Sequence, residues 1–88
     1  MNVEVNITFK GGAGNVTITV FSNGNQVSQV VVLISGTVPL TNVSSGDIIS
    51  IDGISPANGS DISISVSTDP PTPSHYESGP IMDSYIVL

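Results

Sequence analysis

The side chains best suited to chemistry lie in a proline-rich stretch near the end of the chain. His75, Tyr76 and Glu77 are consecutive, and they follow Asp69-Pro70-Pro71-Thr72-Pro73. Because prolines favour the extended polyproline II conformation, we expect residues 69–80 to form an extended loop. An imidazole, a phenol ring and a carboxylate on this loop could bind a small ligand, with carbohydrate as the expected class. In the alternative, His75 is a plain surface residue and Tyr76 fastens the loop to the body of the protein.

A second group of candidate ligands is spread over the predicted turns. Calcium binds several oxygen atoms from carboxylates, amides and backbone carbonyls. Turns at one end of a β-protein could bring such atoms together, so the sequence predicts a candidate calcium site and no other cofactor. The same residues could instead serve only as turn formers and solubilising charge. The candidate ligands are Asp47, Asp52, Asn58, Asp61 and Asp69.

These residues do not form a recognisable catalytic set. A nucleophile needs a base beside it, and His75 is the only histidine in the chain. No serine lies in a Gly-x-Ser-x-Gly sequence, and cysteine is absent. A pair of carboxylates could be drawn from Asp47, Asp52, Asp61 and Asp69. Such a pair would need a deep, dry site to raise the pKa of one carboxyl group, and a chain of 9.0 kDa offers little depth. We therefore expect that the protein is not an enzyme.

The charge balance and the lengths of the apolar stretches argue against two classes of partner. Seven acids stand against one base, Lys10, so the net charge is −6 and the pI is about 4.1. Phosphate backbones are bound by lysine and arginine, so we expect no nucleic-acid binding. No stretch approaches the roughly 18 apolar residues of a membrane-spanning helix, so we expect no membrane insertion. The first residues also lack the basic and apolar regions of a signal peptide.

The elements that must position the candidate ligands are short β-strands. Apolar and polar residues alternate from Val3 to Phe9, from Val16 to Phe21 and from Asp61 to Ser67, which is the period of half-buried strands. Asn23-Gly24 between two such segments predicts a tight hairpin. The glycine-rich segment from Gly11 to Asn15 predicts a second hairpin loop, because glycine permits positive φ.

The longest apolar run, Val30-Val31-Val32-Leu33-Ile34, lies within the stretch from Val27 to Leu40. A strand without a polar side is normally covered on both faces. Its β-branched residues disfavour a helix, and Ser35-Gly36 and Pro39 would make a helix too short. The stretch is therefore predicted to be the central strand.

No segment shows a helical period, so about seven short strands predict one all-β domain over residues 1–88. We expect a small antiparallel β-sandwich of immunoglobulin-like or transthyretin-like type. The alternating apolar residues predict its interior: Val5, Ile7, Phe9, Val16, Ile18, Val20, Val30, Val32, Ile34, Ile49, Ile51, Ile62, Ile64 and Val66.

Residues 81–88 predict a last, apolar strand. It could dock on the sheet of its own chain, or cross to a neighbouring copy and complete that copy's sandwich by strand addition. A chain of this length buries only about 60–65% of its unfolded surface, so further burial against a partner would be favourable. The residues expected to mediate such assembly are Ile81, Tyr85, Ile86, Val87 and Leu88.

Together these features favour a non-catalytic structural or adhesive module of an extracellular, cell-surface or virion assembly. We expect it to self-associate through strand edges or the C-terminal strand, or to contact another surface protein. A surface rich in serine, threonine and asparagine is common in such modules. The alternative is a carbohydrate-binding module, with or without calcium, that uses the loop at residues 69–80.

Overall fold

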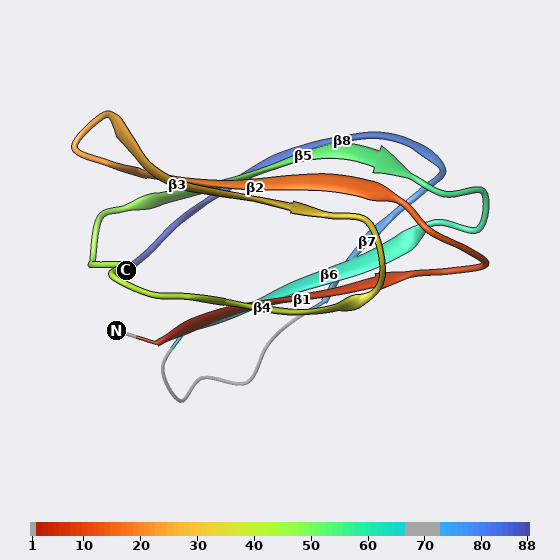
Figure 1. Cartoon of the computed structure of the whole chain (residues 1–88), viewed down its shortest axis with the longest axis horizontal. Coiled ribbons are helices and arrows are strands. Elements are labelled where there is room, and N and C mark those ends of the chain that lie inside the picture. The colour runs from red at the N-terminus through yellow and green to blue at the C-terminus, as the bar shows by residue number, and fades with distance from the viewer. Residues whose placement is uncertain (1, 67–72) are drawn as a thin grey trace.

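The computed structural model describes residues 2–66 and 73–88, and within these ranges the chain forms eight β-strands (Figure 1). They build two four-stranded sheets in which all neighbouring strands pair antiparallel. The strands are β1 (Val3–Phe9), β2 (Asn15–Ser22), β3 (Asn25–Val32), β4 (Gly36–Leu40), β5 (Ile48–Ser55), β6 (Ser60–Val66), β7 (Ser74–Tyr76) and β8 (Gly79–Ile86). The small antiparallel β-sandwich is confirmed, and its immunoglobulin-like or transthyretin-like type stays a prediction. The described part of the chain holds no helix long and apolar enough to cross a membrane.

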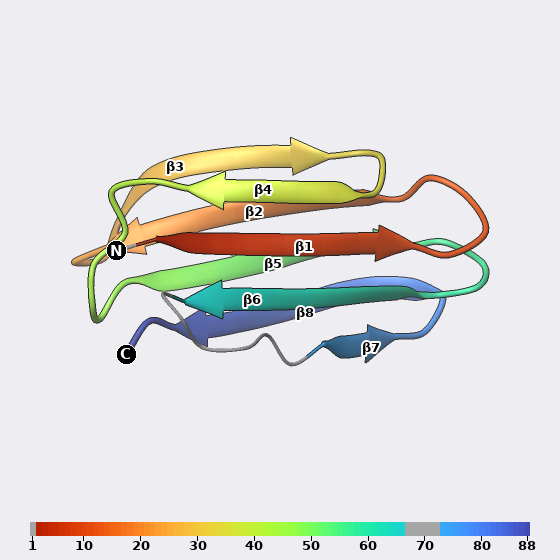
Figure 2. The same cartoon turned by 90° about the horizontal axis from the view of Figure 1, so that it is seen from below.

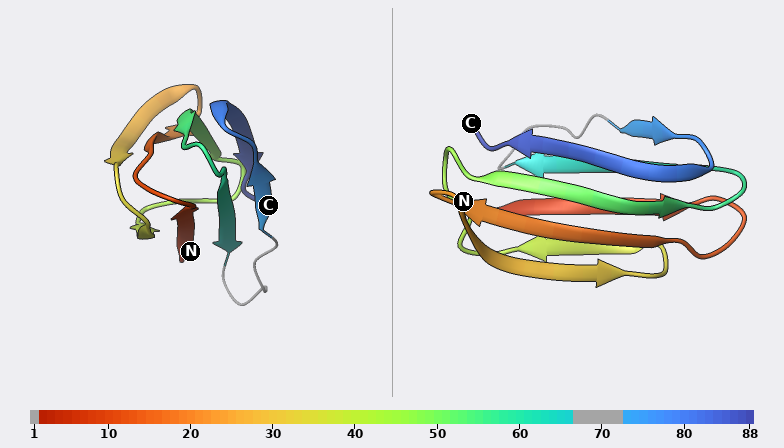
Figure 3. Two further views of the ribbon diagram at one scale, coloured as in Figure 1. Left: turned by 90° about the vertical axis from the view of Figure 1, so that its right-hand side faces the viewer. Right: turned by 90° about the horizontal axis from the view of Figure 1, so that it is seen from above.

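The two sheets are interleaved along the chain. Sheet A has the strand order β4-β1-β6-β7 and is seen in Figure 2, and sheet B has the order β3-β2-β5-β8 and is seen in the right panel of Figure 3. Only β2–β3 and β6–β7 are consecutive strands that share a sheet. The other connections cross from one sheet to the other, so most neighbouring strands are far apart in sequence.

The core between the sheets is aliphatic. Val5, Val16 and Ile18 are fully buried at its centre, and burying one such side chain contributes about 1.5–3 kcal/mol of transfer free energy. Every residue predicted for the interior is buried or packs against the core except Ile34. Five further apolar residues are buried that the alternating pattern did not predict: Val3, Leu40, Val43, Ile81 and Val87.

One of the two predicted hairpins is confirmed. Asn23 and Gly24 have φ angles of 52° and 82°, as a type I′ turn requires, and they join the paired strands β2 and β3. The hairpin predicted at Gly11 to Asn15 is wrong, because β1 lies in sheet A and β2 lies in sheet B. Glycines that permit positive φ suit a link between sheets as well as a hairpin, so local sequence does not separate the two.

The predicted central strand from Val27 to Leu40 is also wrong. The stretch forms β3 and β4, which are edge strands of opposite sheets. Between them the chain crosses the sandwich, and Leu33 and Ile34 are 54% and 73% exposed. The hydroxyl of Ser35 accepts a hydrogen bond of 2.9 Å from the backbone N–H of Phe9, which ties this link to the end of β1.

The last strand docks on its own chain. β8 pairs with β5 along its whole length, from Ile48 opposite Ile86 to Ser55 opposite Gly79. Ile81 in β8 and Val87 just after it are buried in the core. The structure therefore has the first of the two arrangements expected for residues 81–88, and exchange with a neighbouring copy stays a prediction.

Candidate functional site

Charged side chains meet on the outer face of sheet A, where β1 ends and β6 begins. Asp61 in β6 lies opposite His75 in β7, and Lys10 directly follows β1. Asp61 accepts from both neighbours, with 3.1 Å from Lys10 Nζ to Asp61 Oδ2 and 2.9 Å from His75 Nδ1 to Asp61 Oδ1. His75 Nε2 lies 3.7 Å from Glu77 Oε1. We call these four residues the charged cluster.

The hydrogen bond from His75 and the hydrogen bond from Lys10 lower the pKa of Asp61 below its usual value. The cluster is open to water, since the side chains of Lys10, Asp61 and His75 are 44%, 35% and 49% exposed. Ion pairs in such positions contribute little to stability because water and salt screen them. The exposed imidazole has no deep, dry surroundings of the kind that acid–base catalysis uses.

The turn between β5 and β6 supports the cluster from one side. Gly59 has a φ of +86°, and its carbonyl accepts a hydrogen bond of 2.9 Å from the N–H of Lys10. A Cβ atom on Gly59 would lie 2.5 Å from the carbonyl oxygen of Tyr76 and 3.1 Å from Cε1 of His75. The close approach of β7 to this turn therefore depends on glycine.

Tyr76 points away from the charged cluster, into the sandwich. It lies opposite the buried Ser60, packs against the core, and donates a hydrogen bond of 2.6 Å from its hydroxyl to Asp83 Oδ2. Burial, together with this bond to Asp83, raises the pKa of Tyr76 to about 12. This placement matches the alternative in which Tyr76 fastens its segment to the body of the protein.

The predicted ligand-binding trio is thus split between two sides of the strand. His75 and Glu77 belong to the charged cluster, whereas Tyr76 faces inward. Tyr85, like Tyr76, is partly buried against the core, so neither aromatic ring is fully open for a sugar to stack on. Carbohydrate binding stays a prediction. His75 contacts Asp61, and Asp61 in turn contacts Lys10, which the sequence pattern did not connect with the loop.

The predicted calcium ligands are not brought together. Asp47 is buried in the turn before β5, where its carboxylate accepts a hydrogen bond of 2.9 Å from the N–H of Ser44. Asn58 follows β5 at the opposite end of the sandwich, and an eight-residue strand spans about 26 Å. Asp52 lies on the outer face of sheet B, Asp61 lies on sheet A, and Asp69 is outside the described residues. Within the described ranges, no group of three or more His, Cys, Asp or Glu side chains could hold a metal ion.

The outer face of sheet B is unexpectedly apolar. In β5, Ile49 and Ile51 face the core, whereas Ile48 and Ile54 face solvent and are 41% and 56% exposed. Opposite them in β8, Ile86 is 59% exposed, and Met82 beside Asp52 is 87% exposed. The signal in the sequence is a pair of adjacent apolar residues, as in Ile48-Ile49, because an alternating strand turns one of each pair outward.

The outer face of sheet A is polar by contrast. One of its two central strands, β1, presents Glu4, Asn6 and Thr8, while Val5 and Ile7 face the core. Asn6 accepts a hydrogen bond of 2.7 Å from Thr37 in β4. Within the described residues, the exposed large apolar side chains all lie on β3, β5 or β8, on the β3–β4 link, or at the chain end: Val27, Val31, Leu33, Ile34, Ile48, Ile54, Met82, Ile86 and Leu88.

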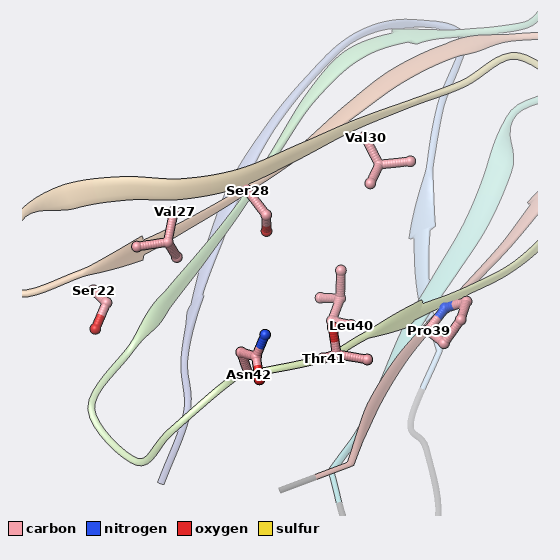
Figure 4. Close-up of a pocket in the computed structure, with 8 residues that line it drawn as sticks. All are labelled: Ser22, Val27, Ser28, Val30, Pro39, Leu40, Thr41 and Asn42. Atoms are coloured by element: carbon pink, nitrogen blue, oxygen red, sulfur yellow. The ribbon is translucent and has the colours of Figure 1, made fainter.

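A groove of about 380 Å³ opens between the edge strands β3 and β4 (Figure 4). The register of β2 with β3 shifts between Val20 and Phe21, which leaves Val27 as a bulge residue without a partner. Figure 4 shows Val27, Ser28 and Val30 extending from β3 toward the β4 side of the groove. No residue that lines it is charged, so it offers a contact surface without acid–base chemistry: Ser22, Val27, Ser28, Val30, Pro39, Leu40, Thr41 and Asn42.

Comparisons of the chain with protein-family models, with curated proteins and with solved structures found no match. Two surfaces are candidates for binding a partner: the open charged cluster on sheet A, and the apolar surface of sheet B with its β3 edge.

Proposed function

We propose that this chain is a non-catalytic structural or adhesive module that associates with copies of itself in an extracellular, cell-surface or virion assembly. The observation that carries the proposal is the collection of exposed aliphatic side chains on sheet B and on the β3–β4 link. Ile34 is 73% exposed and Met82 is 87% exposed, although both are large and apolar. Single exposed apolar residues are ordinary, but a group of them on one sheet is typical of an interaction surface.

The free energy available from covering this surface is considerable. Apolar surface removed from water contributes about 25 cal/mol per Å², so covering several half-exposed aliphatic side chains could support association. The core of so short a chain is thin, and a second copy would add burial that the single sandwich lacks. The polar outer face of sheet A would stay in contact with water.

The distribution of charge supports the same surface. The chain carries a net charge of −6, which makes copies repel one another. Among the described acids, Asp52 is the one on the outer face of sheet B, whereas Glu4 and Asp61 lie on sheet A and Asp47 is buried in a turn. Two copies that approach with sheet B therefore bring few like charges together.

Sedimentation velocity from micromolar to millimolar protein tests the proposal. We expect the sedimentation coefficient to rise with concentration, and to rise further at high salt because salt screens the repulsion between acidic chains. The polar face of sheet A provides a control. Thr8→Lys, at an exposed position on that face, should change the association only as far as one unit of net charge reduces the repulsion. A chain that stays monomeric up to millimolar concentration at both salt levels would refute the proposal.

A further inference from the structure

The four edge strands of the sandwich differ in how they are protected. An edge strand presents unpaired N–H and C=O groups, and soluble proteins usually block such edges with proline, charge or short length. β4 carries Pro39, β7 has only three residues, and β8 carries Pro80 and the charged Asp83. Asp83 lies opposite the buried Ile51, so its carboxylate is on the inward face, where an added strand would have to cover it.

β3 has none of these devices. Its eight residues contain no proline and no charged side chain, and half of them are valine, which favours strands. Its one protective feature is a bulge at Val27, near the end of the strand that joins β2. From Ser28 to Val32 the strand pairs regularly with β2 on one side, and its other side is the free edge of sheet B.

We propose that β3 pairs antiparallel with β3 of a second copy, so that two copies of sheet B join into one continuous sheet. The inference rests on the proposed self-association, and it names the edge and the partner. A two-fold axis brings each strand against its own sequence, so the strand must be compatible with itself. A neutral strand meets this condition, because no charge faces its own copy even though each chain carries −6.

The pairing would also cover the apolar side chains around this edge. Val27 and Val31 are 56% and 57% exposed on β3, and Leu33 and Ile34 continue directly from its end. The inward-facing side chains of the second β3 would lie over the groove next to Leu40. One pair of eight-residue edges buries less than about 1,200 Å², the size of weak and transient contacts, so we expect a dissociation constant in the micromolar range or weaker.

A matched pair of lysine substitutions tests the edge. Ser28 is exposed in β3 and lies opposite the buried Val20, so it faces inward. The Ser28→Lys substitution places a charge on the inward face of β3, as Asp83 does in β8. The Thr8→Lys substitution puts the same residue on the polar outer face of sheet A, away from the apolar surface of sheet B. Both substitutions change the net charge by one unit, so general repulsion changes equally.

Sedimentation equilibrium is the readout for both variants, with circular dichroism as the check of folding. We expect Ser28→Lys to weaken association at least about tenfold and Thr8→Lys to change it less than about twofold. The opposite ranking would overturn the β3 edge while leaving self-association intact, and a chain that never associates would overturn both proposals.

Hydrogen exchange on the unsubstituted chain gives a second test that does not depend on a variant that folds. Backbone amides of β3 should exchange more slowly at concentrations above the dissociation constant than below it, whereas those of β8 should not change. Slowing confined to β8 or β7 would overturn the proposal.

Discussion

The hydroxyl of Tyr76 donates a hydrogen bond of 2.6 Å to the carboxylate of Asp83, and this bond joins the two sheets at their β7–β8 side. Tyr76 lies on the edge of sheet A and Asp83 on the edge of sheet B, and both face inward. At the opposite side, β3 and β4 leave a groove between them. In the end-on view of Figure 3 (left), β3 and β4 lie at one side and β7 and β8 at the other. The sandwich therefore has one side closed by a polar contact and one side that is open and lined by uncharged residues.

The Tyr76–Asp83 contact predicts a stability that falls at alkaline pH. The folded state raises the pKa of Tyr76 from its ordinary value of 10.0 to about 12, so the neutral phenol is favoured by folding. The contribution is fully present below pH 10 and is lost as the pH rises from about 10 to about 12. Urea unfolding across this range should show a steeper loss of free energy in the unsubstituted chain than in Tyr76→Phe. Equal slopes for the two proteins would contradict the prediction.

The charged cluster predicts an ordered pair of pKa changes at Asp61. The hydrogen bond from His75 is the largest cause of its lowered pKa and the bond from Lys10 the next. Carbon-13 NMR titration of the Asp61 carboxyl should therefore find a higher pKa in His75→Ala and a smaller rise in Lys10→Ala. Because the pKa is lowered on folding, the stabilising contribution is present above pH 3.8 and disappears as the pH falls through the folded pKa. A larger rise of the Asp61 pKa in Lys10→Ala than in His75→Ala would contradict the prediction.

Gly53 predicts a strong local effect of one methyl group. A Cβ atom at this position would overlap the backbone carbonyl oxygen of Asn15 in the neighbouring strand β2. Gly53→Ala should lower the free energy of unfolding by about 1–3 kcal/mol, because the backbone must shift to admit it. Gly36→Ala is the matched control, since no atom lies within 4 Å of its Cβ position, and its effect should stay within about 0.5 kcal/mol. Chemical denaturation of both variants measures the two changes in the free energy of unfolding. Equal changes would contradict the register of β2 with β5.

The last strand predicts that residues 81–88 are required for folding. Their removal takes away the buried Ile81 and Val87 and leaves β5 from Ile48 to Gly53 without its neighbour on the side away from β2. We expect the truncated chain to show no cooperative thermal transition, because a domain with so thin a core has little free energy of unfolding to lose. Adding a synthetic peptide of residues 79–88 should restore a cooperative transition if the strand can be supplied from outside. A truncated chain that melts like the complete one would contradict the docking of β8.

Local pattern predicted several elements well because it reports directly on which residues of a strand share a face. The alternation in Val3 to Phe9 predicted both the strand and its buried side, and Asn23-Gly24 predicted a hairpin whose φ angles match. The run from Val30 to Ile34 led to the wrong prediction of a central strand, because a run of five apolar residues does not by itself show that all five are buried. In the fold the chain leaves sheet B within this run, and Ile34 faces water.

The candidate site was predicted only in part for a related reason. His75 and Glu77 were visible as neighbours in sequence, but Lys10 and Asp61 join them only because β6 lies between β1 and β7. The calcium ligands, in turn, were all plausible by residue type, yet Asp47 and Asn58 lie at opposite ends of β5.

The sequence by itself determined an all-β domain without cysteine, with a strongly acidic charge and a thin aliphatic core, because residue type, two-residue alternation and turn residues act locally. Only the tertiary structure decided which strands are neighbours, which edge is left without charge or proline, and which of two adjacent isoleucines faces water. The physical reason is that pairing between strands depends on packing across the whole chain. A short segment pairs equally well, by its local pattern, with several partners.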